Sequence, residues 1–210
     1  MTENMEGLEL KDRLNLIENM IAEGRRGTES WGWAFVFWGV AYYIAIAWSS
    51  GGFGGPTWSR NYLAWPVTMI GGVVLSWILA ARKSRKQPAT TIGRSIGSVW
   101  AGMGISTFPI MFALGFSGRM DTHTAVAIIG AMLGAANITS SIILKWKMQF
   151  ACGVVWLTTG AASCFLSENQ AGILFLVAIF FCQIVFGIYG MIADSRKQKV
   201  NGTGQGVSHA

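Results

Sequence analysis

Residues 31–48 read WGWAFVFWGVAYYIAIAW and contain no charged residue. A helix of about 20 apolar residues spans the hydrocarbon core of a bilayer, which is roughly 30 Å thick. This stretch comes close to that length, and it is bounded by a charged segment before Trp31 and a glycine-rich loop after Ser50. It is therefore predicted to be a membrane-spanning helix and the first of several.

Further apolar blocks of similar length follow. The chain has 210 residues, of which 52% are hydrophobic and only 12% are charged, whereas globular proteins carry about 25% charged residues. The blocks lack the alternation of apolar and polar residues that barrel strands require. The sequence therefore predicts an all-α integral membrane protein with six transmembrane helices, at 31–50, 62–81, 96–117, 123–144, 149–166 and 171–193.

Lysine and arginine fall on alternate connections between these six segments. Of the 16 such residues, all but Arg60 and Arg119 lie before the first segment, after the second, after the fourth or after the sixth. Loops rich in Lys and Arg stay in the cytoplasm. The pattern therefore predicts that both termini are cytoplasmic. It also accounts for the net charge of +6 without nucleic acid, which we do not expect as a partner.

The segment before the membrane domain is predicted to be a cytoplasmic amphipathic helix and linker, residues 1–28. Leu10, Leu14, Ile17 and Ile21 recur at spacings of four, three and four, which places them in one narrow stripe. Acidic residues surround the stripe, so the helix suits a partner helix better than an anionic lipid surface. The partner could be the protein's own cytoplasmic ends, a second copy or another protein. At the other end of the chain, the polar tail 195–210 is predicted to be disordered.

Small and polar residues interrupt the transmembrane domain, residues 29–194, at a few positions. Gly130 and Gly134 form a GxxxG pattern, which favours close helix packing within one chain or between two. Pro109 predicts a kink, because proline leaves the carbonyl of the residue four positions earlier without its backbone donor. Asn137 and Gln183 are predicted either to hydrogen-bond between helices or to line a polar path.

The predicted spans contain no Asp, Glu, Lys, Arg or His in their cores, which counts against proton-coupled or cation-coupled carriers. The absence of these residues does not exclude a pore lined by hydroxyl groups and backbone carbonyls. His123 and Asp121 are best explained as the solvated start of a helix. The cysteines Cys152, Cys164 and Cys182 fall inside predicted spans and are expected to be buried free thiols. No catalytic, cofactor-binding or metal-binding set is identified, so the protein is not expected to be an enzyme.

One segment carries a resemblance. Residues 8–39, LELKDRLNLIENMIAEGRRGTESWGWAFVFWG, pair an acidic start of the form L-x-x-I-E-x-M-I with a WGW-like beginning of the first span. In this respect the chain resembles uncharacterised small bacterial multi-span inner-membrane proteins. The residues that carry the likeness are Leu14, Ile17, Glu18, Met20, Ile21, Trp31, Gly32, Trp33, Trp38 and Gly39. The resemblance implies a bacterial inner-membrane location and no site residues.

Two functions fit these features. The preferred expectation is a non-enzymatic association, scaffold or regulatory protein. Its N-terminal helix would bind a second copy or a cytoplasmic partner, and its spans would anchor it in the lipid bilayer. The alternative is a small channel or transporter for a neutral or weakly polar solute, with Asn137, Gln183 and Pro109 along its path.

Overall fold

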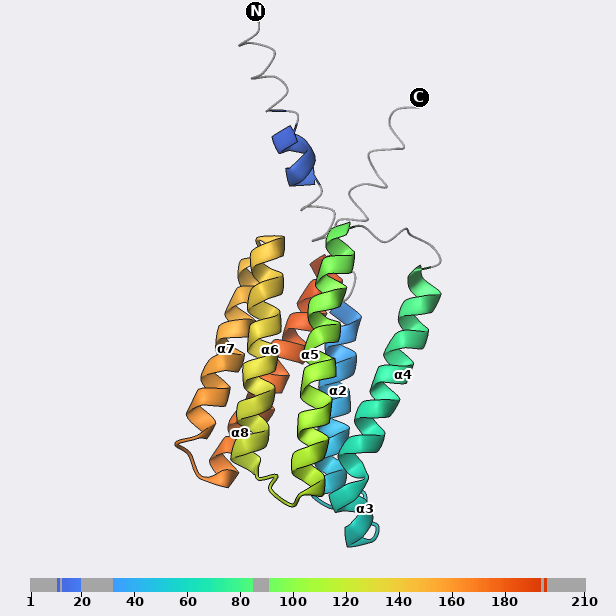
Figure 1. Cartoon of the computed structure of the whole chain (residues 1–210), viewed down its shortest axis with the longest axis vertical. Coiled ribbons are helices and arrows are strands. Elements are labelled where there is room, and N and C mark those ends of the chain that lie inside the picture. The colour runs from blue at the N-terminus through green and yellow to red at the C-terminus, as the bar shows by residue number, and fades with distance from the viewer. Residues whose placement is uncertain (1–10, 12, 20–31, 85–90, 194, 196–210) are drawn as a thin grey trace, which may run out of the picture.

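The computed structural model describes residues 11, 13–19, 32–84, 91–193 and 195, and over these residues it contains helices and turns but no strand. The helices in chain order are α2 (Gly32–Ser49), α3 (Thr57–Tyr62), α4 (Ala64–Ser84), α5 (Thr91–Phe116), α6 (Thr122–Leu144), α7 (Lys147–Ser163) and α8 (Glu168–Ile179), which continues through the π-helical segment η1 (Phe180–Val185) (Figure 1). The predicted all-α fold is confirmed for this part of the chain.

Five of these helices are long and apolar enough to cross a membrane, and they point to a membrane location. They are Gly32–Ser49, Ala64–Arg82, Thr91–Phe116, Thr122–Leu144 and Glu168–Ala193. The remaining predicted span, 149–166, is the fifth in chain order and corresponds to α7, which is 17 residues long. At 1.5 Å per residue, α7 is about 26 Å long, slightly less than a bilayer core of about 30 Å. Five of the six predicted spans are therefore helices long and apolar enough to cross a membrane, and α7 is shorter.

Helix ends differ from the predicted boundaries where local hydrogen bonds set them. α8 begins at Glu168 rather than 171 because Ser167 and Gln170 form a capping box, in which each side chain bonds the other's backbone N–H. α7 ends at Ser163 rather than 166, because the chain turns back at Cys164 to reach that cap. α5 begins at Thr91 rather than 96, since helical geometry continues through the charged residue Arg94.

The helices form one bundle in which consecutive long helices run in opposite directions (Figure 1). α6 packs closely against α7, α2 packs against α4 and η1, and α5 packs against α6. A Cβ on Gly32 would lie 2.8 Å from the backbone nitrogen of Met191, so the start of α2 lies beside the end of the last helix. The two ends of the membrane domain therefore lie at the same end of the bundle.

The contact between α6 and α7 is made by glycines. A Cβ on Gly130 would lie 2.9 Å from the Cα of Gly160, and one on Gly134 would lie 3.1 Å from the carbonyl oxygen of Gly153. The absence of side chains at these four positions lets the two backbones touch, as small residues do in membrane helices. The GxxxG pair of α6 therefore packs within its own chain.

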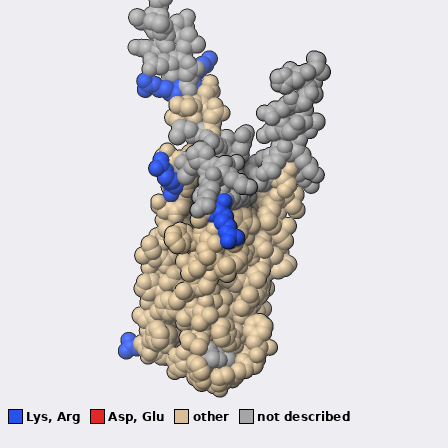
Figure 2. Space-filling view, turned by 90° about the vertical axis from the view of Figure 1, so that its right-hand side faces the viewer, with Lys and Arg blue, Asp and Glu red and all other residues tan. Residues whose placement is uncertain are grey.

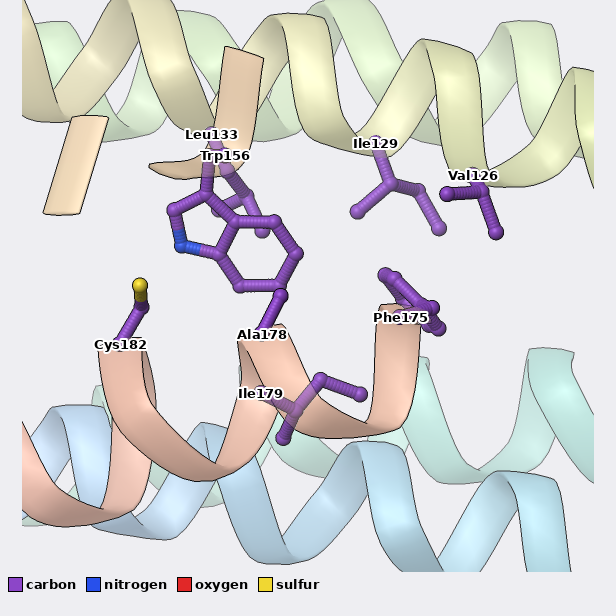
Figure 3. Close-up of a cluster of buried hydrophobic side chains, with 8 residues drawn as sticks. All are labelled: Val126, Ile129, Leu133, Trp156, Phe175, Ala178, Ile179 and Cys182. Atoms are coloured by element: carbon purple, nitrogen blue, oxygen red, sulfur yellow. The ribbon is translucent and has the colours of Figure 1, made fainter. Parts of the chain in front are cut away.

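Three clusters of buried apolar side chains lie in the bundle, and the smallest contains Ala41, Ala45 and Met69. The Trp156 cluster contains Val126, Ile129, Leu133, Trp156, Phe175, Ala178, Ile179 and Cys182 (Figure 3). The Trp146 cluster contains Phe35, Ile96, Leu144, Trp146 and Phe186. The second cluster includes edge-to-face aromatic contacts, with the ring of Phe35 5.5 Å from that of Trp100 and 5.0 Å from that of Phe186.

The outer wall of the bundle is apolar. On α4 the exposed side chains include Val73, Val74, Leu75 and Trp77. Figure 2 shows one face of the bundle, where Lys and Arg lie at the two ends and the wall between them carries no charge. A continuous exposed apolar surface of this kind is typical of contact with lipid or with another protein.

Candidate functional site: a buried polar layer

Five buried polar side chains lie between the Trp156 and Trp146 clusters; one, Ser141, donates to the Ile138 carbonyl, and the other four have polar atoms without a partner among the described residues. Asn137 and Ser140 come from α6, Gln149 from α7 and Gln183 from η1, and each is at most 2% exposed. On all three elements these residues lie, in sequence, between members of the Trp156 cluster and members of the Trp146 cluster. We call these four residues the polar layer.

Contacts between the helices place the layer within about one helical turn along the bundle. A Cβ on Gly153 would lie 3.0 Å from the backbone nitrogen of Ile138, so Asn137 is level with the stretch of α7 around Gly153. The thiol of Cys182 lies 3.8 Å from the carbonyl oxygen of Cys152, which brings the start of η1 to the same level. Ser140 and Gln149 then lie about one helical turn, roughly 5 Å, further toward the α6–α7 turn.

Several polar atoms of the layer have no hydrogen-bond partner among the described residues. They are Oδ1 of Asn137, Oγ of Ser140, both amide atoms of Gln149 and Oε1 of Gln183. The amide nitrogen of Asn137 donates to the Leu133 carbonyl of its own helix at 2.8 Å, rather than to a neighbouring helix. Most of the layer's hydrogen-bonding capacity is therefore unused by the protein.

Trp156 adds a donor to the layer. Its indole nitrogen is buried and has no acceptor within the described part of the chain. In Figure 3 this nitrogen points toward the Cys182 end of the Trp156 cluster, where the layer begins. The site thus combines a fixed N–H donor with amide oxygens, a hydroxyl group and one amide that offers both donors and an acceptor.

The helix that carries Gln183 is π-helical over Phe180–Val185. Such wider turns are rare and occur frequently at functional sites. On the opposite side Gly39 of α2 makes room, since a Cβ there would lie 2.9 Å from the Cβ of Gln183. The side chain of Gln183 is thus enclosed by α2 at the point where the helix geometry changes.

The sequence identified two of the four layer residues. Asn137 and Gln183 are each a lone amide in an apolar stretch, and that signal was sufficient to single them out. Ser140 and Gln149 were missed. For Ser140, the only indication in the sequence is that it follows Asn137 by three residues, which places both on one face of a helix. Gln149 follows Lys147 by two residues, so its position suggests the polar end of a helix and not its interior.

Other predicted residues lie elsewhere. Pro109 is exposed on α5, which continues through it as a helix to Phe116. The hydroxyl of Thr107 donates to the Met103 carbonyl, so it does not serve the Ile105 carbonyl that Pro109 leaves without a donor. Pro109 therefore lies on the outer surface of the bundle, whereas Asn137 and Gln183 lie in its interior.

The cysteines differ from one another. Cys182 is buried and Cys152 is partly buried, and both border the layer. Cys164 is exposed, because it lies in the turn after α7 and not inside a helix. The expectation that all three thiols are buried is therefore wrong for Cys164.

Part of the N-terminal helix is described. Residues 13–19 are helical, and the side chains of Leu14 and Ile17 are 53% and 52% exposed. Leu10 and Ile21, the other two members of the predicted stripe, lie outside the described residues, as does the tail 196–210.

The start of α6 is held by two polar contacts. Asp121 caps the helix, with its carboxylate accepting from the backbone N–H of Thr124 at 2.6 Å. The Nδ1 atom of His123 lies 2.8 Å from the Ser163 carbonyl oxygen at the end of α7. Asp121 therefore acts as the predicted cap, and His123 joins the ends of two helices.

The cap predicts a pH dependence. Hydrogen bonding from Thr124 lowers the pKa of Asp121 below its ordinary value of 3.8. Because the folded state favours the carboxylate, its contribution to stability is complete above that value and is lost as the pH falls through the lower pKa of the folded protein. We expect Asp121→Asn, which keeps a capping side chain, to lower the thermal midpoint at pH 6, and we expect the difference from the wild type to shrink as the pH falls below 3.8. A difference between the two proteins that does not shrink on acidification would contradict this assignment.

The described residues include no group of three or more His, Cys, Asp or Glu side chains that could hold a metal ion. The layer itself is uncharged and offers hydrogen bonds alone. No protein family, curated protein or solved structure matches this chain.

Proposed function

We propose that this chain is a six-span protein of a bacterial inner membrane, with both termini in the cytoplasm, that acts by association rather than by catalysis. The N-terminal helix binds a partner helix through the stripe of Leu10, Leu14, Ile17 and Ile21. The membrane domain anchors this helix at the cytoplasmic surface.

The exposure of Leu14 and Ile17 carries the proposal. These two side chains belong to a short helix. Every residue of this helix from 13 to 19 is exposed. An isolated helix of this length is marginal in water. A second helix against the stripe would bury both side chains and stabilise the first, as in a short coiled coil.

Six spans are supported by the way α7 lies against α6. His123, at the start of α6, contacts the carbonyl of Ser163 at the end of α7. At the opposite end, the backbone N–H of Trp146 donates to the Ser141 carbonyl at 3.0 Å across the turn. α7 therefore returns along the full length of α6, and if one crosses the bilayer, so does the other.

Substitutions in the stripe test the association. We expect the double variant Leu14→Asp, Ile17→Asp to lose its oligomer or its bound partner, because each substitution places a charge in the buried seam of the two helices. The measurement is the mass of the detergent-solubilised protein by size-exclusion chromatography with light scattering, together with recovery of partners after cross-linking in cells.

Leu16 provides a matched control on the same helix. It is 61% exposed and lies between the two stripe residues in sequence, but on the opposite face of the helix. Leu16→Asp should leave the mass and the cross-linked partners unchanged. If the double variant behaves like Leu16→Asp, the stripe is not an association surface.

The alternative function, passage of a neutral solute, has weaker support. Asn137 and Gln183 are both buried between the two apolar clusters, but Pro109 lies on the surface of α5. The layer residues are at most 2% exposed, so this conformation closes them off from both solvent and lipid. Passage would require α2 or η1 to move, whereas association uses a surface that is already exposed.

A further inference from the structure

We propose that the polar layer binds a small neutral molecule that both donates and accepts hydrogen bonds, of which water is the smallest example. The site consists of Asn137, Ser140, Gln149 and Gln183, with the indole N–H of Trp156 at its edge. This inference is independent of the association proposed above, since it concerns the interior of the bundle.

The first argument is the cost of leaving these groups unpaired. A buried polar group without a hydrogen bond destabilises the fold, because it has lost its bonds to water, and a bilayer offers it no water in exchange. Six such atoms gather here on five residues, all at most 2% exposed. They lie within about two helical turns of one another on α6, α7 and η1, where the two apolar clusters meet. A further unpaired atom, Oγ of Ser76, lies apart from them on α4.

The second argument concerns charge. Amide oxygens and a hydroxyl group would suit a cation, but the indole N–H and the Gln149 amide N–H₂ would oppose it. The same oxygens would oppose an anion. None of the four layer residues or of the members of the two clusters is charged. A mixed set of donors and acceptors in a site of low polarity fits a neutral guest, which can match both kinds of group at once.

The third argument is the local backbone. Gln183 sits in the π-helical segment η1, opposite Gly39, where a larger residue would collide with its Cβ. The glycine lets α2 approach η1 closely at Gln183, so α2 covers this unpaired amide and separates it from lipid.

One test measures whether a substitution in the polar layer raises or lowers the thermal midpoint of the protein. We expect Gln149→Met to lower the thermal midpoint by about 1–6 °C, because it removes hydrogen bonds to the bound molecule. If the layer were dry, the same substitution would raise the midpoint, since it would remove two unpaired atoms and keep the volume. Thr158→Val is the control: its hydroxyl is exposed and already bonded to the Val154 and Val155 carbonyls at 3.0 Å, so it should change little.

A second test observes the guest directly in the wild-type protein. With ¹⁵N-labelled tryptophan and the protein in nanodiscs, the Trp156 indole N–H should show magnetisation transfer from a bound molecule, and Trp156→Phe assigns its signal. Transfer from water identifies water as the occupant. Transfer from isotopically labelled urea, added at a non-denaturing concentration, identifies a larger neutral solute. Absence of both transfers, or a rise in the midpoint of Gln149→Met, would overturn the proposal.

Discussion

Gly130→Val is expected to lower the free energy of unfolding by about 3 kcal/mol, because the new side chain has no space to occupy. A Cβ at this position would lie 2.8 Å from the Trp156 carbonyl oxygen and 2.9 Å from both Cα and N of Gly160. All three are backbone atoms, so no side-chain rotation relieves the collision. α6 and α7 would have to separate, and in a membrane their association depends on this close packing.

Gly102→Val is the matched control. Gly102 is also a helical glycine, in α5, but a Cβ there would meet nothing within 4 Å outside its own helix. The two variants share the same change in helix propensity and differ only in the space around the new side chain. Unfolding in mixed detergent, followed by circular dichroism, should separate them clearly. Equal losses of stability in both variants would mean that the α6–α7 contact does not stabilise the bundle.

This glycine contact shows what the sequence could and could not predict. The GxxxG pair Gly130 and Gly134 marked the correct face of α6 for packing. Its partners Gly153 and Gly160 are seven residues apart in α7 and form no such pattern. The identity of the partner helix depends on how the chain folds back at Lys145, whose backbone adopts a left-handed conformation with φ of 51°. Spacing within one helix cannot reveal this turn.

The polar layer was predictable to a similar extent. A lone amide in an apolar helix is visible in the sequence, and Asn137 and Gln183 were identified in this way. That Gln149 joins them follows from the antiparallel pairing of α6 and α7, which is a tertiary property. The π-helical turn at Gln183 has no signature in residue type. The helical fold and the apolar blocks were therefore predictable from composition, whereas the convergence of polar groups was not.

Cys164 of the wild-type protein is expected to react with a membrane-impermeant maleimide added outside spheroplasts. This thiol is exposed in the turn between α7 and α8, whereas Cys152 is partly buried and Cys182 is buried in the bundle. With six spans and a cytoplasmic N-terminus, this turn faces the periplasm. The expected labelling is nearly complete for Cys164, and it should be lost in Cys164→Ala.

The same reagent decides the number of crossings. In the Cys164→Ala background, Ser50→Cys should react from outside, and Ser84→Cys should react only after the membrane is permeabilised. If α7 did not cross the membrane, Cys164 would lie on the same side as Ser84 and would be protected in intact spheroplasts. That result would contradict both the six-span topology and the return of α7 along α6, because His123 and Ser163 hold the start of α6 and the end of α7 together. A short helix of 17 residues can cross because its neighbour sets its depth and the bilayer can thin locally around it.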